Sequence, residues 1–245
     1  MAQVDEVLET LRALGKPENL AGMARFGINT SNTFGVTVTV LRGVAKRLGR
    51  DHALALKLWD TGVREARLLA AMTADPSAMT RRDMERWVCA LDSWDVCDCC
   101  CMDLFRKTPF AWEKALAWSA RKPEFVKRAG FALMATTTSY DKAAPDERFL
   151  ALLPVIERES TDERNFVKNA VNWALRQIGK RNPALREAAV KTAAGLKKSE
   201  SRSARWIGSD ALRELRAADE RAGNYTKPAR SSRAFGSGSR PMKER

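Results

Sequence analysis

FVKRAGFALM (residues 125–134) and FVKNAVNWAL (166–175) share a core in which an apolar residue, a basic residue and any residue are followed by Ala. Apolar residues in both segments recur at spacings of three and four, which places them on one face of an α-helix. VREARLLAAM (63–72) and LREAAVKTAA (185–194) contain the same core. We therefore expect a set of related helices along the chain.

The distances between these cores indicate how the helices are arranged. Ala66 and Ala129 are 63 residues apart, and Ala129 and Ala170 are 41 residues apart. A repeat of roughly 30–45 residues built from helical pairs is typical of an α-solenoid of HEAT type. We predict an all-α protein of about a dozen short helices with a concave basic face, and an irregular helical bundle is the alternative.

The rest of the chain supports this fold class. Turn signals containing Gly or Pro recur every 12–20 residues, and Thr80 with Asp83 is a helix-start capping pair. TFGVTVTVL is the one candidate strand, but its continuation LRGVAKRLG favours a helix there. We assign residues 1–217 to the solenoid and residues 218–245, which are rich in Ser, Gly, Pro and Arg, to a basic disordered tail.

The charge of the chain suggests a polyanionic partner. The 245 residues contain 43 Lys and Arg against 30 Asp and Glu, a net charge of +13. The tail contributes seven basic and three acidic residues, a net +4, so the body keeps +9. A surface this basic usually faces nucleic acid or an acidic membrane. We find no secretion signal and no apolar run of the roughly 18 residues that a membrane span needs.

The five cysteines fit a reducing compartment, so we expect a cytoplasmic protein. All five lie in WVCALDSWDVCDCCCMDLF (87–105), and four of them fall within the five positions 97–101, where a metal site, a redox site and simple packing are the alternatives. Structural zinc needs four converging ligands, commonly from two separate pairs, and no second cluster exists. We interpret the cysteines as small apolar residues that pack between helices, and we predict no metal and no cofactor.

The same stretch contains a more informative pair. Trp94 and Asp98 are four residues apart and share one face of a helix, whereas Asp95 points elsewhere. An indole beside a carboxylate is usually a packed core tryptophan next to a surface acid. The pair gains a functional interpretation only from other segments of the chain.

Five segments in this order resemble the bacterial DNA alkylation repair glycosylases built from HEAT-like repeats, the AlkD-like family. They are RFGI (25–28), LWDTGVREARLLA (58–70), WDVCD (94–98), FVKRAGF (125–131) and NAVNWALRQIG (169–179). The resemblance extends from about residue 20 to about residue 217. The cysteine-rich continuation CDCCC departs from the family pattern, but Asp98 is retained.

The resemblance implies roles for individual residues. Asp98 corresponds to the catalytic carboxylate, Trp94 and Trp173 correspond to two aromatic walls, and Arg128 corresponds to the arginine of the next segment, able to clamp a phosphate. Arg128 could instead cover a neighbouring repeat, and Trp173 could belong to the core. Further candidates for DNA binding neighbour these motif residues, although they could equally be charges of a solvated face: Lys127, Lys168 and Arg176.

The implied reaction is hydrolysis of the N-glycosidic bond of cationic alkylated purines in double-stranded DNA. Examples are 3-methyladenine and 7-methylguanine, and the family's mechanism without base flipping would also allow bulkier adducts. A carboxylate can stabilise the oxocarbenium character that develops on the sugar, and aromatic faces attract a cation. No histidine is required, and the chain has only one. We expect a monomeric base excision repair enzyme, with a non-catalytic DNA-binding module of HEAT repeats as the alternative.

Overall fold

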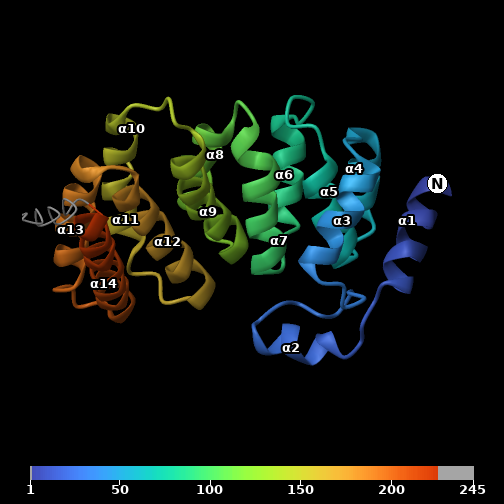
Figure 1. The fold of residues 1–245 in the computed structure, drawn as a ribbon, viewed down its shortest axis with the longest axis horizontal. Coiled ribbons are helices and arrows are strands. Elements are labelled where there is room, and N and C mark those ends of the chain that lie inside the picture. The colour runs from blue at the N-terminus through green and yellow to red at the C-terminus, as the bar shows by residue number, and fades with distance from the viewer. Residues whose placement is uncertain (1, 226–245) are drawn as a thin grey trace, which may run out of the picture.

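The structure, a computed structural model, describes residues 2–225, with side chains for residues 3–217. Every regular element in this part of the chain is a helix (Figure 1), which confirms the prediction of an all-α protein. The α-helices are α1 (Ala2–Ala13), α2 (Asn19–Arg25), α3 (Val38–Leu48), α4 (His52–Asp60), α5 (Arg64–Thr73), α6 (Arg81–Cys89), α7 (Trp94–Cys99), α8 (Ala111–Ser119), α9 (Glu124–Tyr140), α10 (Asp146–Leu150), α11 (Leu153–Glu159), α12 (Asn165–Arg181), α13 (Pro183–Leu196) and α14 (Arg202–Tyr225).

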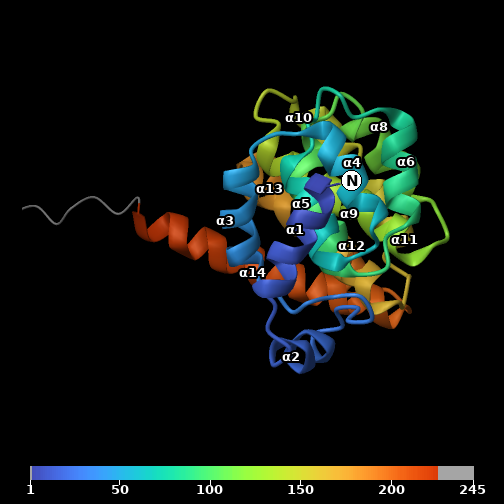
Figure 2. The same ribbon diagram turned by 90° about the vertical axis from the view of Figure 1, so that its right-hand side faces the viewer.

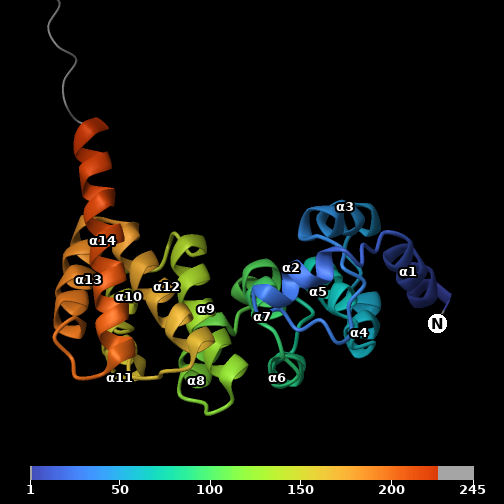
Figure 3. The same ribbon diagram turned by 90° about the horizontal axis from the view of Figure 1, so that it is seen from below.

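The helices stack side by side in two rows, as expected for a solenoid. In Figure 3 an inner row of α5, α7, α9 and α12 lies above an outer row of α4, α6, α8 and α11. Helices α3 and α14 extend upward from the two ends of the inner row, away from the outer row (Figure 3). The inner row therefore forms the floor of a concave face.

The shared sequence core marks equivalent helices in three of its four occurrences. Residues 63–72, 125–134 and 166–175 lie in α5, α9 and α12, each of which packs against the helix that precedes it. Their aligned residues Ala66, Ala129 and Ala170 are fully buried. Residues 185–194 instead lie in α13, the first helix of the last pair. The shared sequence pattern therefore indicates a helix with one apolar face, and helices of either row need such a face.

Close packing fixes α9 against its partner α8. A Cβ atom on Gly130 would lie 2.4 Å from the backbone nitrogen of Ser119, so a side chain at this position would push the two helices apart. Behind this contact, the outer row is joined by aromatic rings. Trp59 and Trp87 stack with their centroids 4.1 Å apart, and Phe105 packs against Trp118 at 5.6 Å. These rings stabilise the relative positions of successive repeats.

The chain stays helical beyond the last residue of α7, but with different hydrogen bonding. It continues into a π-helix, η1 (Cys100–Leu104), and a 3-10 turn, η2 (Phe105–Lys107). The predicted capping pair before α6 is confirmed, since Thr80 and Asp83 form a reciprocal capping box. The candidate strand is replaced by α3 from Val38 onward, as its continuation predicted.

Two features lie outside the regular stack. The short helix α2 lies below the inner row, apart from the stacked helices (Figures 1 and 2). Helix α14 passes through the predicted boundary between residues 217 and 218 and continues to Tyr225, and the predicted tail beyond it lies outside the described residues. Of the helices in the described range, none has the length and apolar character needed to span a membrane.

Candidate functional site

The centre of the site is an ion pair between two inner-row helices. Arg128, in the second turn of α9, donates from Nε to Asp98 Oδ1 at 2.9 Å and from Nη2 to Asp98 Oδ2 at 2.7 Å. Its remaining nitrogen, Nη1, donates to the carbonyl oxygen of Phe166 in α12 at 2.7 Å. One guanidinium thus connects α7, α9 and α12. A bidentate pair of this kind fixes the plane of the carboxylate.

The Asp98 carboxylate keeps access to solvent. Its side chain is 17% exposed, against 8% for the side chain of Arg128. Burial raises the pKa of Asp98 above its ordinary value, while the charge and hydrogen bonds of Arg128 act in the opposite direction. Because an arginine stays protonated, Asp98 has a permanent cationic partner. The result is a rigid, ionised carboxylate on the inner-row helix α7.

Trp94, which the resemblance predicts as the first aromatic wall, lies beside this ion pair. The Arg128 guanidinium carbon lies 5.9 Å from the centroid of the Trp94 ring, so the predicted pair on α7 faces the arginine on α9. The Trp94 indole nitrogen donates to the carbonyl oxygen of Phe26 at 2.9 Å. This bond holds the ring in one orientation and attaches it to the segment that follows α2.

The segment after α2 brings a second aromatic ring that the sequence analysis did not assign. Phe26 is 69% exposed, and the Arg25 guanidinium lies 5.9 Å from the centre of its ring. Gly27 follows with φ +73°, and a Cβ at this position would lie 2.8 Å from the Phe166 ring. A glycine is therefore required both by the backbone conformation and by the close approach. The available sequence signal was the place of Phe26 in RFGI, one of the five resembling segments.

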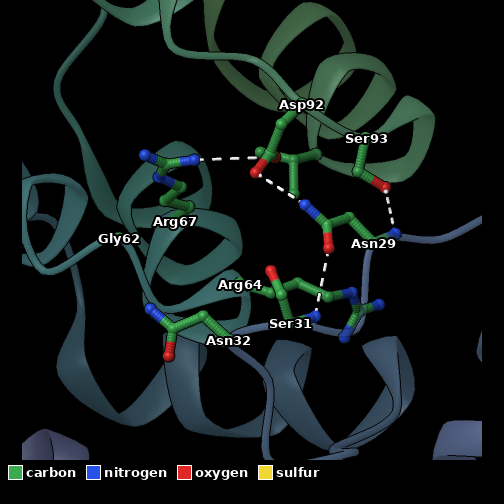
Figure 4. Close-up of a pocket in the computed structure, with 9 residues that line it drawn as sticks. Asn29, Ser31, Asn32, Gly62, Arg64, Arg67, Asp92 and Ser93 are labelled. Carbon is green, nitrogen blue, oxygen red and sulfur yellow. Dashed lines mark hydrogen bonds and ion pairs between the residues drawn. The ribbon is translucent and has the colours of Figure 1, made fainter.

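A polar junction fastens this segment to the start of α7 (Figure 4). The Asn29 side-chain amide donates to Asp92 at 3.0 Å, and its backbone N–H donates to the Ser93 hydroxyl at 3.3 Å. Arg67 lies 3.6 Å from the other oxygen of Asp92. The junction encloses a cavity of ≈ 10 Å³, which is about the space of one water molecule.

Two adjacent buried charged residues, Arg64 and Glu65, fix the loop before α3 and the start of α7. Glu65 is fully buried and accepts backbone N–H bonds from Phe34, Gly35 and Val36 at 3.0–3.1 Å. Arg64, the residue before it, donates to Asp95 at 2.7 Å, and Asp95 accepts from the Ser93 hydroxyl at 2.6 Å. Asp95 therefore serves the structure of α7, in agreement with its prediction as a residue that points away from Trp94.

Trp173 lies on α12, two helical turns after Phe166, and therefore on the same side of that helix. It is half-buried and packs against the apolar core with part of its surface. The sequence offered Trp173 as an aromatic wall or as a core residue. The structure is compatible with both, because part of the side chain packs against the core and part is accessible.

The four cations predicted to bind DNA have different surroundings. Arg128 directs all three of its nitrogens to protein acceptors, so it clamps Asp98 where the sequence predicted a phosphate. The Lys127 ammonium lies 2.7 Å from Glu159 and 3.3 Å from Asp162, and Arg176 is paired with Glu214. These pairs argue against phosphate contacts by Lys127 and Arg176. Lys168 lies 5.1 Å above the ring of Trp206, which is 39% exposed.

The cysteine cluster is buried under the site. Cys97, Cys99, Cys100 and Cys101 are each at most 9% exposed, and the Cys97 and Cys101 thiols point at the carbonyl oxygens of Phe125 and Ala129. Burial raises the pKa values of Cys99, Cys100 and Cys101 well above the ordinary value, which keeps these thiols protonated. These surroundings agree with the packing interpretation. The described residues contain no group of three His, Cys, Asp or Glu placed to hold a metal ion.

Comparisons with known proteins point in one direction. The model of a family described as DNA alkylation repair enzyme matches residues 7–215. A solved structure is similar over 89% of this chain and 94% of its own, with 22% sequence identity and a TM-score of 0.76. It is described as belonging to a new family of proteins related to the HEAT-like repeat DNA glycosylases with affinity for branched DNA structures. This likeness confirms the predicted solenoid of HEAT-like repeats. No curated protein matches the chain.

Proposed function

Because the chain belongs to the family of DNA alkylation repair enzymes, we propose that it is a DNA glycosylase that removes cationic alkylated purines from double-stranded DNA. The observation that carries the proposal is the Asp98 carboxylate, held by two hydrogen bonds from Arg128 beside the Trp94 ring. Substrates of this class include 3-methyladenine and 7-methylguanine. The site needs no metal and no cofactor for this reaction.

The chemistry begins from a base that is already a good leaving group. Alkylation at N3 or N7 gives the purine a positive charge, so the N-glycosidic bond breaks as the base takes the bonding electrons and becomes neutral. Positive charge then develops on the deoxyribose. A carboxylate held in place beforehand stabilises that charge more strongly than a freely moving one, and Arg128 holds Asp98 with two hydrogen bonds.

A water molecule completes the reaction at C1′ of the sugar. Its oxygen forms the new bond, and Asp98 accepts the proton or orients the water for attack. Trp94, Trp173 and the exposed ring of Phe26 act as aromatic walls, each worth about 0.5–2 kcal/mol toward a neighbouring cation. We assign Arg128 the role of a positioning residue, because it contacts Asp98 and is oriented away from solvent.

The proposal keeps the lesion on the concave face without base flipping. The Asp98 side chain is 17% exposed, and the Trp94 indole is fixed by its hydrogen bond to the exposed residue Phe26. A site open to solvent in this way would accept bulky adducts as well as methyl groups.

The experiment is base release from methylated duplex DNA under single-turnover conditions, with free 7-methylguanine measured by chromatography. Asp98→Asn keeps the size of the side chain and removes the charge, so we expect a loss of at least about 10²-fold in rate with unchanged DNA affinity. Asp5→Asn is the matched control, since Asp5 is an exposed aspartate of α1, outside the site. Full activity in Asp98→Asn would exclude this mechanism.

A second candidate function is binding of branched DNA without catalysis. The similar solved structure comes from a family with affinity for such DNA, and the Arg128 pair partly neutralises the Asp98 carboxylate. This function predicts tight binding to four-way junctions and no base release from any methylated duplex. Base release from methylated duplex DNA and binding to four-way junctions therefore distinguish the two candidate functions.

A further inference from the structure

A basic groove lies at the end of the inner helices farthest from Asp98. Three adjoining hollows of ≈ 820, 500 and 250 Å³ follow the ends of α3, η2 and α9, and Lys107 lines all three of them. Arg50 lines two of the hollows, and so does Tyr140, whose side chain is 48% exposed. The three hollows are thus parts of one continuous groove.

Positive charge dominates this groove. Its lining contains three carboxylates, Asp75, Asp103 and Asp141, against six cations: Arg42, Lys46, Arg50, Arg106, Lys107 and Lys142. Arg42 is paired with Asp103, and Arg50 lies 3.8 Å from Asp75. Lys46, Lys107 and Lys142 take part in no ion pair with any residue that the structure describes.

The cations of the groove repel one another. Burial lowers the pKa of Lys107, and Arg106, Arg50 and Arg42 lower it further, although Asp103 opposes them. Such an arrangement opposes folding and is compensated when a polyanion occupies the groove. Arg106 lies 5.0 Å from the centre of the Tyr140 ring, so an aromatic surface is available beside the charges.

The position of the groove relative to Asp98 suits a double helix. Arg128 and Tyr140 are twelve residues apart on α9, which corresponds to about 18 Å along the helix axis. The major groove of B-DNA is about 12 Å wide, so the two backbones that border it are separated by a distance of this order. A duplex on the inner row therefore presents one strand to Asp98 and the other to Lys107.

We propose that this groove binds the sugar–phosphate backbone of the strand opposite the lesion, with Lys46, Lys107 and Lys142 as its phosphate contacts. The choice of DNA as the ligand rests on the proposed function. The groove gives the protein a grip on both strands, so it makes recognition specific for duplex DNA, whereas the Asp98 site by itself contacts one strand.

The test is equilibrium binding of an undamaged fluorescent duplex, and of one of its strands alone, at several salt concentrations. The groove variant combines Lys46→Gln, Lys107→Gln and Lys142→Gln. The matched control combines Lys57→Gln, Arg82→Gln and Lys191→Gln. It removes three exposed cations of α4, α6 and α13 that form no ion pair with the residues the structure describes.

We expect the groove variant to bind duplex DNA roughly tenfold or more weakly, with a salt slope smaller by about two to three. Binding of the single strand should fall much less, and the control should match wild type in both assays. The melting temperature of the groove variant should equal or exceed that of wild type, because a repulsion is removed. Equal losses in the groove and control variants, or equal losses for duplex and single strand, would overturn the proposal.

This outcome is independent of catalysis. If the wild-type protein releases no alkylated base, the proposed glycosylase function fails, while the binding comparison still decides whether the groove holds the second strand. If the protein is a glycosylase, the groove variant should release base more slowly than wild type at subsaturating duplex concentrations, in line with its weaker duplex binding.

Discussion

The two ends of α9 use positive charge in opposite ways. Near its N-terminus, Arg128 and Lys127 are paired with Asp98, Glu159 and Asp162. Near its C-terminus, Lys107 and Lys142 lie in a groove without a carboxylate partner among the described residues. Paired cations fix geometry, and unpaired cations remain available to a polyanion. The contrast separates the groups that build the site from the groups that hold the ligand.

The largest effect should come from breaking the Arg128 pair. Arg128→Lys keeps the charge but loses the planar fork, so we expect base release to slow by about 10²–10³-fold with little change in duplex affinity. Single-turnover rates and equilibrium binding measure the two quantities separately. Arg176→Lys is the control, since Arg176 is also ion-paired but lies outside the site. A loss confined to affinity would instead assign Arg128 to phosphate binding.

The next largest effect should come from Glu65, which holds the backbone of the loop before α3. Glu65→Gln exchanges a carboxylate that accepts three backbone N–H bonds for an amide with one acceptor oxygen. We expect the free energy of unfolding to fall by about 2–3 kcal/mol, because buried donors lose their partners. Urea unfolding measures it, with the exposed Glu187→Gln as control. An unchanged midpoint would show that the segment after α2 is held mainly by Trp94 and Asn29.

A smaller effect should follow from the pair that occupies Lys127. Hydrogen bonds from Arg164, together with Lys127, lower the pKa of Asp162 to about 2, from its usual 3.8. The carboxylate therefore stabilises the fold above pH 3.8, and this contribution disappears as the pH falls toward 2. We expect Asp162→Asn to cost about 1 kcal/mol at neutral pH after allowance for solvent screening. Unfolding at several pH values tests the window, and a constant difference at all pH values would contradict it.

The smallest effect is expected in the pH profile of base release. Burial raises the pKa of Asp98, and the reaction needs its ionised form. The rate should therefore decline on acidification at a higher pH than an ordinary aspartate would give. Rates measured between about pH 4 and pH 8 provide the profile, with single-turnover conditions to exclude changes in binding. A flat profile would remove Asp98 from the charge-stabilising role.

Much of the site could be predicted from local sequence, and the reasons are visible in particular residues. Trp94 and Asp98 lie on one face because they are four residues apart on α7, and the repeat placed Arg128 and Trp173 on later helices of the same row. Phe26 was missed because α2 and the loop after it follow no helical repeat. The role of Arg128 changed because its acceptors lie 30 and 38 residues away in the chain.

The sequence by itself determined the helices, their repeat and the family, because apolar periodicity and short motifs act over a few residues. The tertiary structure alone decided which cations are neutralised and which face an open groove. Lys127 and Lys107 are both lysines in helical segments, yet Lys127 is paired with two carboxylates from α11 and the loop after it. Lys107 has no such ion pair among the described residues and feels the charges of Asp103 and of three arginines. Electrostatic partners are set by distances across the packed repeats, and the spacing of residues in the chain does not specify those distances.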